Sequence, residues 1–277
     1  MTKYKNAAKD KVIRLRSHMA VKLLFLLVIL LPVSSWAATA TLVQSNSAEG
    51  SAVASIVSTF TSNVTTGNMI IAFVRLSTLT ATTVTVTDTQ GNTYVDAVAQ
   101  NQDTDQHAIH IFYAKNVTGG ADTVTAAFSS GANNHPWIAI YEWQNMDTVA
   151  PLDKTAVGQG AGVTAATAGT GTTVQGNELL FAGIGVPNNY AGTISIFTGS
   201  GYSLLLQDSG LSRAATLAQN QDVTGSWTSS ATLSTSTNWS AVLAVFKAVA
   251  APTPTPTVTP TATPTPGGSV NNSGWFF

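Results

Sequence analysis

The stretch Thr82–Thr89, TTVTVTDT, alternates threonine with valine and so has a period of two. Side chains of successive residues in an extended strand point to opposite faces. Val84 and Val86 therefore share one face, and the threonines between them share the other. This pattern predicts a half-buried β-strand with one apolar face and one solvent-facing polar face.

Fuller apolar runs lie on both sides of this stretch. Met69–Val74 reads MIIAFV and Glu178–Val186 reads ELLFAGIGV, which is typical of strands inside a sheet. Turn sequences rich in Gly and Asn separate the runs, as in TQGNT and TGGAD. No helical period is sustained after the N-terminal segment 1–37. The sequence therefore predicts an all-β fold of the sandwich type, either jelly-roll or Ig-like.

Four segments of the first half recur in the same order in the second half. TTGNMIIAFV recurs as TVQGNELLFAG, GNTYVDAV as GSGYSLLL, AKNVTGG as AQNQDVTGS, and WIAIYEW as WSAVLAV. The spacing is 109 residues between Asn68 and Asn177 and 102 residues between Trp137 and Trp239. Nearly constant spacing predicts two homologous β-sandwich units in tandem, 38–147 and 148–250. One large pseudo-symmetric sandwich is the alternative.

The N-terminal segment predicts export. Seven Lys and Arg residues precede the apolar run Leu23–Leu31, and small residues follow at Ser35 and Ala37. This is the pattern of a secretory signal peptide spanning 1–37, with Ala40 as the second cleavage position. Translation starting at Met19 instead of Met1 would still give a complete signal. An uncleaved membrane anchor is the alternative, although nine apolar residues fall short of the about 20 that span a bilayer.

Charge and cysteine content narrow the function. After the signal segment the chain keeps five basic and twelve acidic residues, a net charge of −7, and it has no Cys. Nucleic acids and anionic membranes attract basic surfaces, so neither is an expected partner. The absence of Cys excludes thiol chemistry and Cys-ligated metal sites. We expect no membrane span after signal cleavage.

Aromatic residues can serve as sugar-stacking platforms where they are exposed. Trp137, Trp143 and Trp239 fall in apolar strand patterns and are interpreted as core. Trp227 and Tyr190 lie beside Gly, Ser and Asn in segments typical of loops. They are the predicted ligand-binding residues.

The densest polar cluster is DTDQHAIH, Asp103–His110. In a strand, His107 and His110 would point to opposite faces, so we interpret the cluster as a solvated loop and strand edge, not a metal site. Asp88 and Asn92 are interpreted as a hairpin turn, in which such side chains bond their own backbone. A structural calcium ion at Asp88 and Asn92 is the alternative. No other cofactor is expected.

No convincing catalytic set is found. Glu142 is the one acidic residue inside a strongly apolar strand, but no partner carboxylate can be named for a glycosidase. The sequence contains no G-x-S-x-G nucleophile elbow, no H-E-x-x-H zinc motif and no Gly-rich phosphate-binding loop. We therefore predict that the protein is not an enzyme.

A resemblance adds to this interpretation. IFYAKNVTGGADTVTAAF, then WIAIYEW and PLDKTAV, with GNELLFAG later, resemble a large group of secreted bacterial β-sandwich proteins that are often multi-modular. The Pro/Thr-rich linker at 251–266 looks like those of bacterial glycan-acting and surface proteins. The resemblance implies the fold and secretion, and no site residues.

The expected function is therefore a secreted, non-catalytic binding or adhesive module at or outside the cell surface, with a polysaccharide or cell-surface glycan as the leading ligand. A structural surface or appendage component that self-associates is the alternative, and a glycan-acting hydrolase ranks third. The linker should be extended, and the disordered tail 267–277 is expected either to lead into a further module or to be a docking peptide.

Overall fold

The structure is a computed structural model that describes residues 38–77, 83–129, 131–196, 200–208, 210 and 213–249. These residues form antiparallel β-strands, numbered β1 to β14, and contain no helix. The prediction of an all-β fold is confirmed. The predicted signal peptide, the linker and the tail lie outside the described residues.

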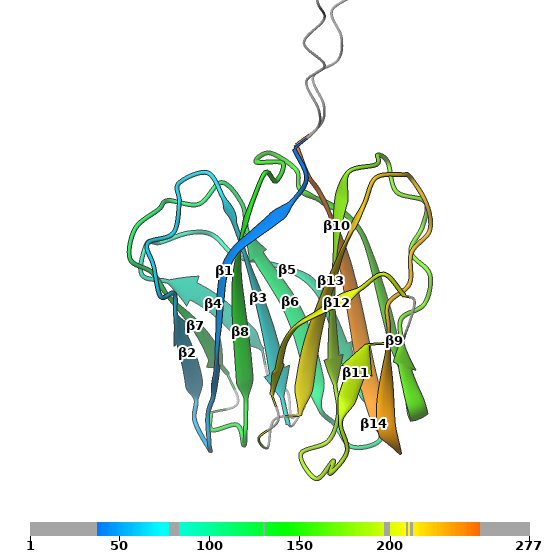
Figure 1. Cartoon of the computed structure of the whole chain (residues 1–277). Coiled ribbons are helices and arrows are strands. Elements are labelled where there is room, and N and C mark those ends of the chain that lie inside the picture. Colours follow the sequence, from blue (N-terminus) through cyan, green and yellow to red (C-terminus); the bar gives the residue numbers. More distant parts are fainter. Residues whose placement is uncertain are drawn as a thin grey trace, which may run out of the picture.

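Three sheets stack as layers (Figure 1). In spatial order, the three-stranded sheet contains β2 (Ser55–Thr59), β7 (Thr123–Phe128) and β4 (Val84–Asp88). The five-stranded sheet contains β1 (Thr41–Glu49), β8 (Trp137–Gln144), β3 (Met69–Leu76), β6 (Ala108–Ala114) and β5 (Val95–Asn101). The six-stranded sheet contains β11 (Ile194–Ile196), β14 (Ser230–Lys247), β10 (Glu178–Gly185), β13 (Ala214–Gln221) and β12 (Ser203–Asp208), and β9 (Leu152–Ala166) also pairs with β14.

The first core fills the space between the three-stranded and five-stranded sheets. In β4, Val84 and Val86 are buried while the threonines beside them are exposed, as the alternation predicted. These valines pack with the even-numbered side chains of β3, such as Ile70 and Val74. The period of two therefore decides which face of each strand closes this core.

The central core lies between the five-stranded and six-stranded sheets and contains side chains from both halves of the chain. Phe73 and Tyr141 come from the five-stranded sheet, and Phe181 and Phe246 come from the six-stranded sheet. The Tyr141 and Phe181 rings meet edge to face at 5.0 Å between centroids. Because β3 and β10 are covered on both faces, all their residues are buried, which explains the unbroken apolar runs.

The outer face of the six-stranded sheet is closed by the long strands β9 and β14 folding back over it. Their register shifts between Thr232 and Thr237, and Gly162 takes the left-handed region at φ +139°. The chain after β9 then returns over its own start, where Ala168 N–H donates to the Val157 carbonyl at 2.9 Å. This fold-back encloses a third core, which we call the outer core and which includes Leu180, Ala231 and Leu233.

The two larger sheets share one strand order. The order β1-β8-β3-β6-β5 has the same pattern of chain connections as β9-β14-β10-β13-β12. Odd-numbered residues of β3 and of β10 face the central core, so the spacing between matching residues must be even. The sequence alignment of Asn68 with Asn177, at 109 residues, is therefore out of register by one residue.

The same error affects the two tryptophans. Trp137 and Trp239 lie on corresponding strands, β8 and β14, but on opposite faces. Trp137 is in the central core, whereas Trp239 packs partly buried against the outer core. Their interpretation as equivalent core residues is wrong. A one-residue slip moves every side chain of a strand to its other face, and alternating low-complexity sequence conceals such a slip.

Candidate functional site

The structure buries one of the two predicted ligand-binding aromatics. The Tyr190 ring is 5% exposed and belongs to the outer core. Its hydroxyl donates to the Thr193 carbonyl at 3.0 Å. Tyr190 therefore presents no open face on which a sugar could stack, and it is not the loop platform that the sequence suggested.

Trp227 is half-buried. Its backbone pairs with Thr170, and its ring packs against the outer core and against Gly225. The indole Nε1 is buried without a partner among the described residues. As a residue Trp227 is partly exposed, so it keeps at most a reduced surface for a ligand.

Asp88 and Asn92 form the turn that the sequence predicted. The Asp88 carboxylate accepts hydrogen bonds from the Asn92 backbone N–H at 2.9 Å, the Asn92 amide at 2.7 Å and the Tyr94 hydroxyl at 3.1 Å. Burial raises the pKa of the neighbouring Asp122, and so does the charge of Asp88. The described residues contain no group of three or more His, Cys, Asp or Glu placed to hold a metal ion.

The cluster Asp103–His110 does not form a solvated edge throughout, contrary to the sequence interpretation. His107 is 1% exposed and points toward the six-stranded sheet, whereas His110 lies on the other face, beside Asp96 at 2.9 Å. The two imidazoles therefore lie on opposite faces, as the strand period predicted, and they share no site.

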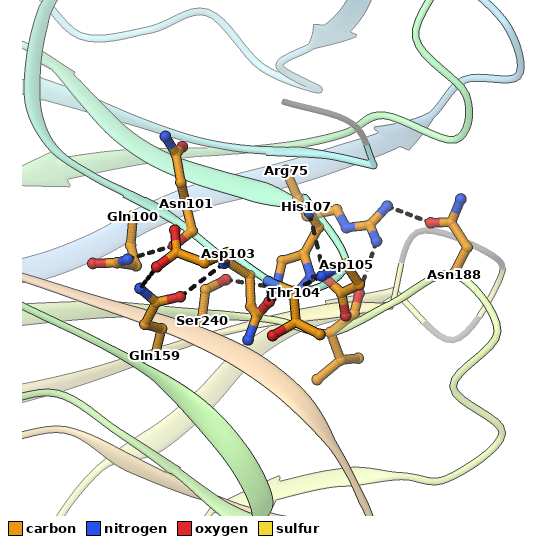
Figure 2. Close-up of polar contacts among 12 residues, drawn as sticks. Arg75, Gln100, Asn101, Asp103, Thr104, Asp105, His107, Gln159, Asn188 and Ser240 are labelled. Atoms are coloured by element: carbon orange, nitrogen blue, oxygen red, sulfur yellow. Dashed lines mark hydrogen bonds and ion pairs between the residues drawn. The ribbon is translucent and has the colours of Figure 1, made fainter. Parts of the chain in front are cut away.

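His107 connects a carboxylate-bearing residue to a hydroxyl-bearing one. Its Nδ1 lies 2.5 Å from Asp105 Oδ1, and its Nε2 lies 2.8 Å from Ser240 Oγ (Figure 2). Burial would raise the pKa of Asp105, but the hydrogen bond and charge of His107 bring this pKa below its ordinary value. Burial lowers the pKa of His107, although Asp105 opposes the shift.

The order of these contacts is that of a Ser-His-Asp triad, but the residues form a buried structural link between two sheets, which we call a strut. Ser240 is 0% exposed, and an attacking hydroxyl must reach the substrate carbonyl. Gly185 leaves room for the contact, because a Cβ there would lie 2.6 Å from Ile109 and 3.1 Å from Ser240 Oγ. The arrangement joins the two larger sheets and offers no route to a substrate in this conformation.

A second polar strut lies beside the first. Arg75, also 0% exposed, donates to the Val186 carbonyl at 2.7 Å and to Asn188 Oδ1 at 2.5 Å. Gln159 Nε2 donates to Asp103 Oδ2 at 2.7 Å on the other side (Figure 2). The Arg75 bonds give this buried guanidinium partners across the junction of the two sheets, and the Gln159–Asp103 bond joins exposed side chains at its rim.

Glu142, the candidate tuned acid, is held as a structural acceptor. Its carboxylate accepts from Gln44 Nε2 at 2.6 Å, from the Thr65 backbone N–H at 2.8 Å and from Asn68 Nδ2 at 2.6 Å. Glu142 is fully buried. Three donors fix the position of this buried carboxylate, and among the described residues no second carboxylate faces it across a cleft.

Sequence reasoning missed a carboxyl pair at the start of β10. Glu178 is 1% exposed, and its pKa is raised to about 7, first by burial and then by the adjacent Asp153 carboxylate. Lys154 Nζ lies 3.3 Å from Asp153 Oδ1 and favours the charge on Asp153. Glu178 therefore carries the proton of the pair over most of the acidic range.

A small cavity opens where β12 and β13 meet the five-stranded sheet, and we call it the β12–β13 pocket. It has a volume of about 250 Å³. The buried side chains of Trp143, Leu179 and Ala218 line it, together with Gly201 and Leu205 and the polar residues Ser203, Gln219 and Asn220. No charged residue lines this pocket within the described part of the chain.

The polar groups of this pocket are mostly uncommitted. Asn220 Nδ2 donates to the Ala40 carbonyl at 3.0 Å, but the Gln219 amide and the Ser203 hydroxyl make no hydrogen bond to the residues that the structure describes. Gly201, at φ +78°, leaves the space that the Gln219 amide occupies. The pocket thus combines an apolar wall with free neutral donors and acceptors.

The signal for this pocket is weak in the sequence. Ser203, Gln219 and Asn220 lie near strand ends, Ser203 on a different strand from the other two, and polar residues at strand ends are ordinary.

The described residues contain no helix that could cross a bilayer. Comparisons of the chain with protein-family models, curated proteins and solved structures give no match.

Proposed function

We propose that this chain is a secreted, non-catalytic binding module that holds a neutral saccharide unit in the β12–β13 pocket. The observation that carries the proposal is the pairing of an aromatic wall, Trp143, with the free Gln219 amide and Ser203 hydroxyl in an uncharged cavity. Ligand sites characteristically combine an apolar lining with a few polar groups that set orientation.

The chemistry of a pyranose matches this lining. Its C–H faces are apolar, and its hydroxyl groups both donate and accept hydrogen bonds. A Gln side chain offers two N–H donors and an acceptor oxygen, and a Ser hydroxyl offers one donor and two lone pairs. The pocket of about 250 Å³ is slightly smaller than the about 300 Å³ at which ligand pockets typically begin. This small volume limits the ligand to a single sugar unit held weakly.

A glycan array followed by calorimetry tests this function. We expect saccharide binding that requires no metal and that falls about tenfold in the double variant Gln219→Ala, Ser203→Ala, because each neutral hydrogen bond contributes about 0.5–1.5 kcal/mol. Gln207→Ala is the matched control, since Gln207 is exposed on the same edge strand outside the pocket. Unchanged affinity in the double variant, or no glycan bound on the array, would contradict the proposal.

A structural surface component is the second candidate. The three-stranded sheet has β2 and β4 at its edges, and their sequences SIVST and VTVTD are rich in Ser and Thr. Unpaired edge strands can add strands from another copy. Filaments of the purified protein in electron micrographs would favour this function.

We also propose that the chain arose by duplication, giving β-sandwich units at 38–147 and 148–250 behind a signal peptide at 1–37. The support is the matching order β1-β8-β3-β6-β5 and β9-β14-β10-β13-β12. Further support is that Thr167, Thr170 and Thr173 bond to the segment before β14, much as β2 pairs with β7 before β8. In this proposal the larger sheet of each unit packs on that of the other.

A further inference from the structure

A second cavity lies on the opposite lateral edge of the central layers, and we call it the β5–β6 pocket. It has a volume of about 300 Å³. Its lining includes Val95 of the edge strand β5 and Tyr113 of β6, together with Asn92, Thr93, Lys115 and Asn116 in the segments that adjoin these strands. Lys115 is the one charged residue in this lining among the described residues.

The two pockets occupy corresponding places in the two larger sheets. Each is centred on a cross-strand pair between an edge strand and its neighbour, Val95 with Tyr113 in one sheet and Ser203 with Ala218 in the other. Tyr113 and Ala218 both face the central core. Lys115 follows Tyr113 by two residues just as Asn220 follows Ala218, so these two side chains hold matching positions.

The five-stranded sheet supplies the aromatic wall of both pockets. In the β5–β6 pocket, Tyr113 comes from the five-stranded sheet and meets Phe246 of the six-stranded sheet at 5.3 Å between centroids. In the β12–β13 pocket, Ala218 comes from the six-stranded sheet and Trp143 from the five-stranded sheet. Trp143 and Phe246 pair with Met69 and Leu179 near the starts of β3 and β10. Each pocket thus has one large aromatic wall. In the β5–β6 pocket this wall lies on the strand next to the edge strand, and in the β12–β13 pocket it reaches the pocket from across the central core.

Lys115 distinguishes the two pockets chemically. Its exposed ammonium group donates one hydrogen bond to the Val149 carbonyl, and an ammonium group has three N–H donors. The nearby Asp147 carboxylate accepts from the backbone N–H groups of Val149 at 2.8 Å and Ala150 at 3.1 Å. The charges of Asp147 and Lys115 also attract each other. Lys115 makes its one hydrogen bond to the described residues through Val149, so two of its donors remain for a ligand, whereas the matching residue in the other pocket is a neutral amide.

We propose that the β5–β6 pocket is a second saccharide-binding site, selective for a carboxylate-bearing sugar, and that the module is therefore bivalent. This inference rests on the proposed function for the assumption that the ligand is a saccharide. The location of the site and its preference for a charged sugar are argued from the lining of the β5–β6 pocket. Two weak sites on one rigid body raise the avidity for a polymer that can reach both.

The probes are methyl β-glucoside and methyl β-glucuronide, which differ only in the carboxylate at C6. Binding is followed by backbone amide shifts of the isotope-labelled secreted chain. We expect the glucuronide to shift Lys115 and Asn116 and the glucoside to shift Gln219 and Asn220. The preference of the β5–β6 pocket for the glucuronide should be about fivefold at low salt and decline in high salt, because the ion pair is exposed.

Matched blocking variants test each site separately. Val95→Trp and Ser203→Trp place an indole at corresponding, exposed positions of the two pockets. Each should abolish ligand-induced shifts in its own pocket and leave those of the other unchanged. The reciprocal changes Lys115→Asn and Asn220→Lys should transfer the glucuronide preference from one pocket to the other.

The outcomes separate this inference from the proposed function. If the glucoside binds at Gln219 and neither probe shifts Lys115 or Asn116, the second site is refuted and the proposed function stands. If the glucuronide binds at Lys115 and Gln219 never responds, the β12–β13 assignment fails while the second site stands. If Val95→Trp leaves the Lys115 shifts intact, or if neither pocket responds to either sugar, the inference is overturned.

Discussion

Buried carboxyl groups illustrate how surroundings decide the role of a residue. Glu142 and Glu178 are both buried acidic residues in central strands. Glu142 accepts three hydrogen bonds that hold it in place, whereas burial and then the neighbouring Asp153 carboxylate raise the pKa of Glu178 to about 7. A group of this second kind makes stability depend on pH.

We predict that Glu178 makes the protein less stable as the pH rises from about 4.5 to about 7. The folded pKa exceeds the ordinary value, so the folded state holds the proton more tightly, and the stabilisation is complete at low pH and lost through this window. Chemical denaturation across the window should show Glu178→Gln with a flatter profile than the wild type. Asp222→Asn, which changes an exposed acid, is the control and should keep the wild-type slope. Identical slopes for wild type and Glu178→Gln would disprove this role.

At the scale of elements, the contact between β3 and β10 sets how closely the two larger sheets approach. Gly183 faces Phe73 across the central core, and a Cβ at Gly183 would collide with the Phe73 ring. Phe73 in turn meets Trp137 edge to face at 5.7 Å. The missing side chain at Gly183 therefore allows the aromatic packing of the central core.

Gly183→Ala should destabilise the protein by about 1–3 kcal/mol, because overfilling a packed core forces side chains out of their preferred rotamers. Phe73→Leu in the Gly183→Ala background should recover part of this loss by removing the colliding ring atoms. Gly171→Ala is the control, since its nearest contact would be Lys154 at 3.9 Å. Urea denaturation measures all of these variants. A neutral Gly183→Ala would mean that the two sheets can separate at β3 and β10 without cost.

At the scale of the whole molecule, the central core joins the first and second halves of the chain. It contains Phe73 and Trp137 from one half and Phe181 and Phe246 from the other. The struts of His107 with Ser240 and of Arg75 with Val186 cross the same junction. Neither half can unfold without exposing this shared apolar surface.

We therefore expect one cooperative thermal transition, in which the calorimetric and van't Hoff enthalpies agree. Trp137→Ala should lower the stability of the whole molecule by about 3–5 kcal/mol, the usual cost of truncating a buried aromatic residue. Trp239→Ala should cost less, because Trp239 is only partly buried. Differential scanning calorimetry distinguishes the alternatives. A split into two transitions, with only the lower one shifted by Trp137→Ala, would show that the halves melt independently.

Local sequence patterns were sufficient to predict the strands and the core-facing side of β4. In β4 the alternation of Val84 and Val86 with threonine located the core side, and the unbroken apolar runs of β3 and β10 indicated strands inside a sheet. The separation of His107 from His110 followed from the strand period alone. These features depend on local chemistry, and local patterns record them directly.

The register of the repeated segments and the location of the pockets depend on contacts between strands that are distant in sequence. Alignment of repeated segments placed Trp137 opposite Trp239, but a slip of one residue puts them on different faces, and neighbouring Thr, Ala and Ser residues carry too little information to reveal it. Tyr190 has the sequence context of a loop residue, yet the fold-back of β9 and β14 encloses it. Gln219, Ser203 and Trp143 become a pocket because strands distant in sequence meet in space, and no local pattern encodes that meeting.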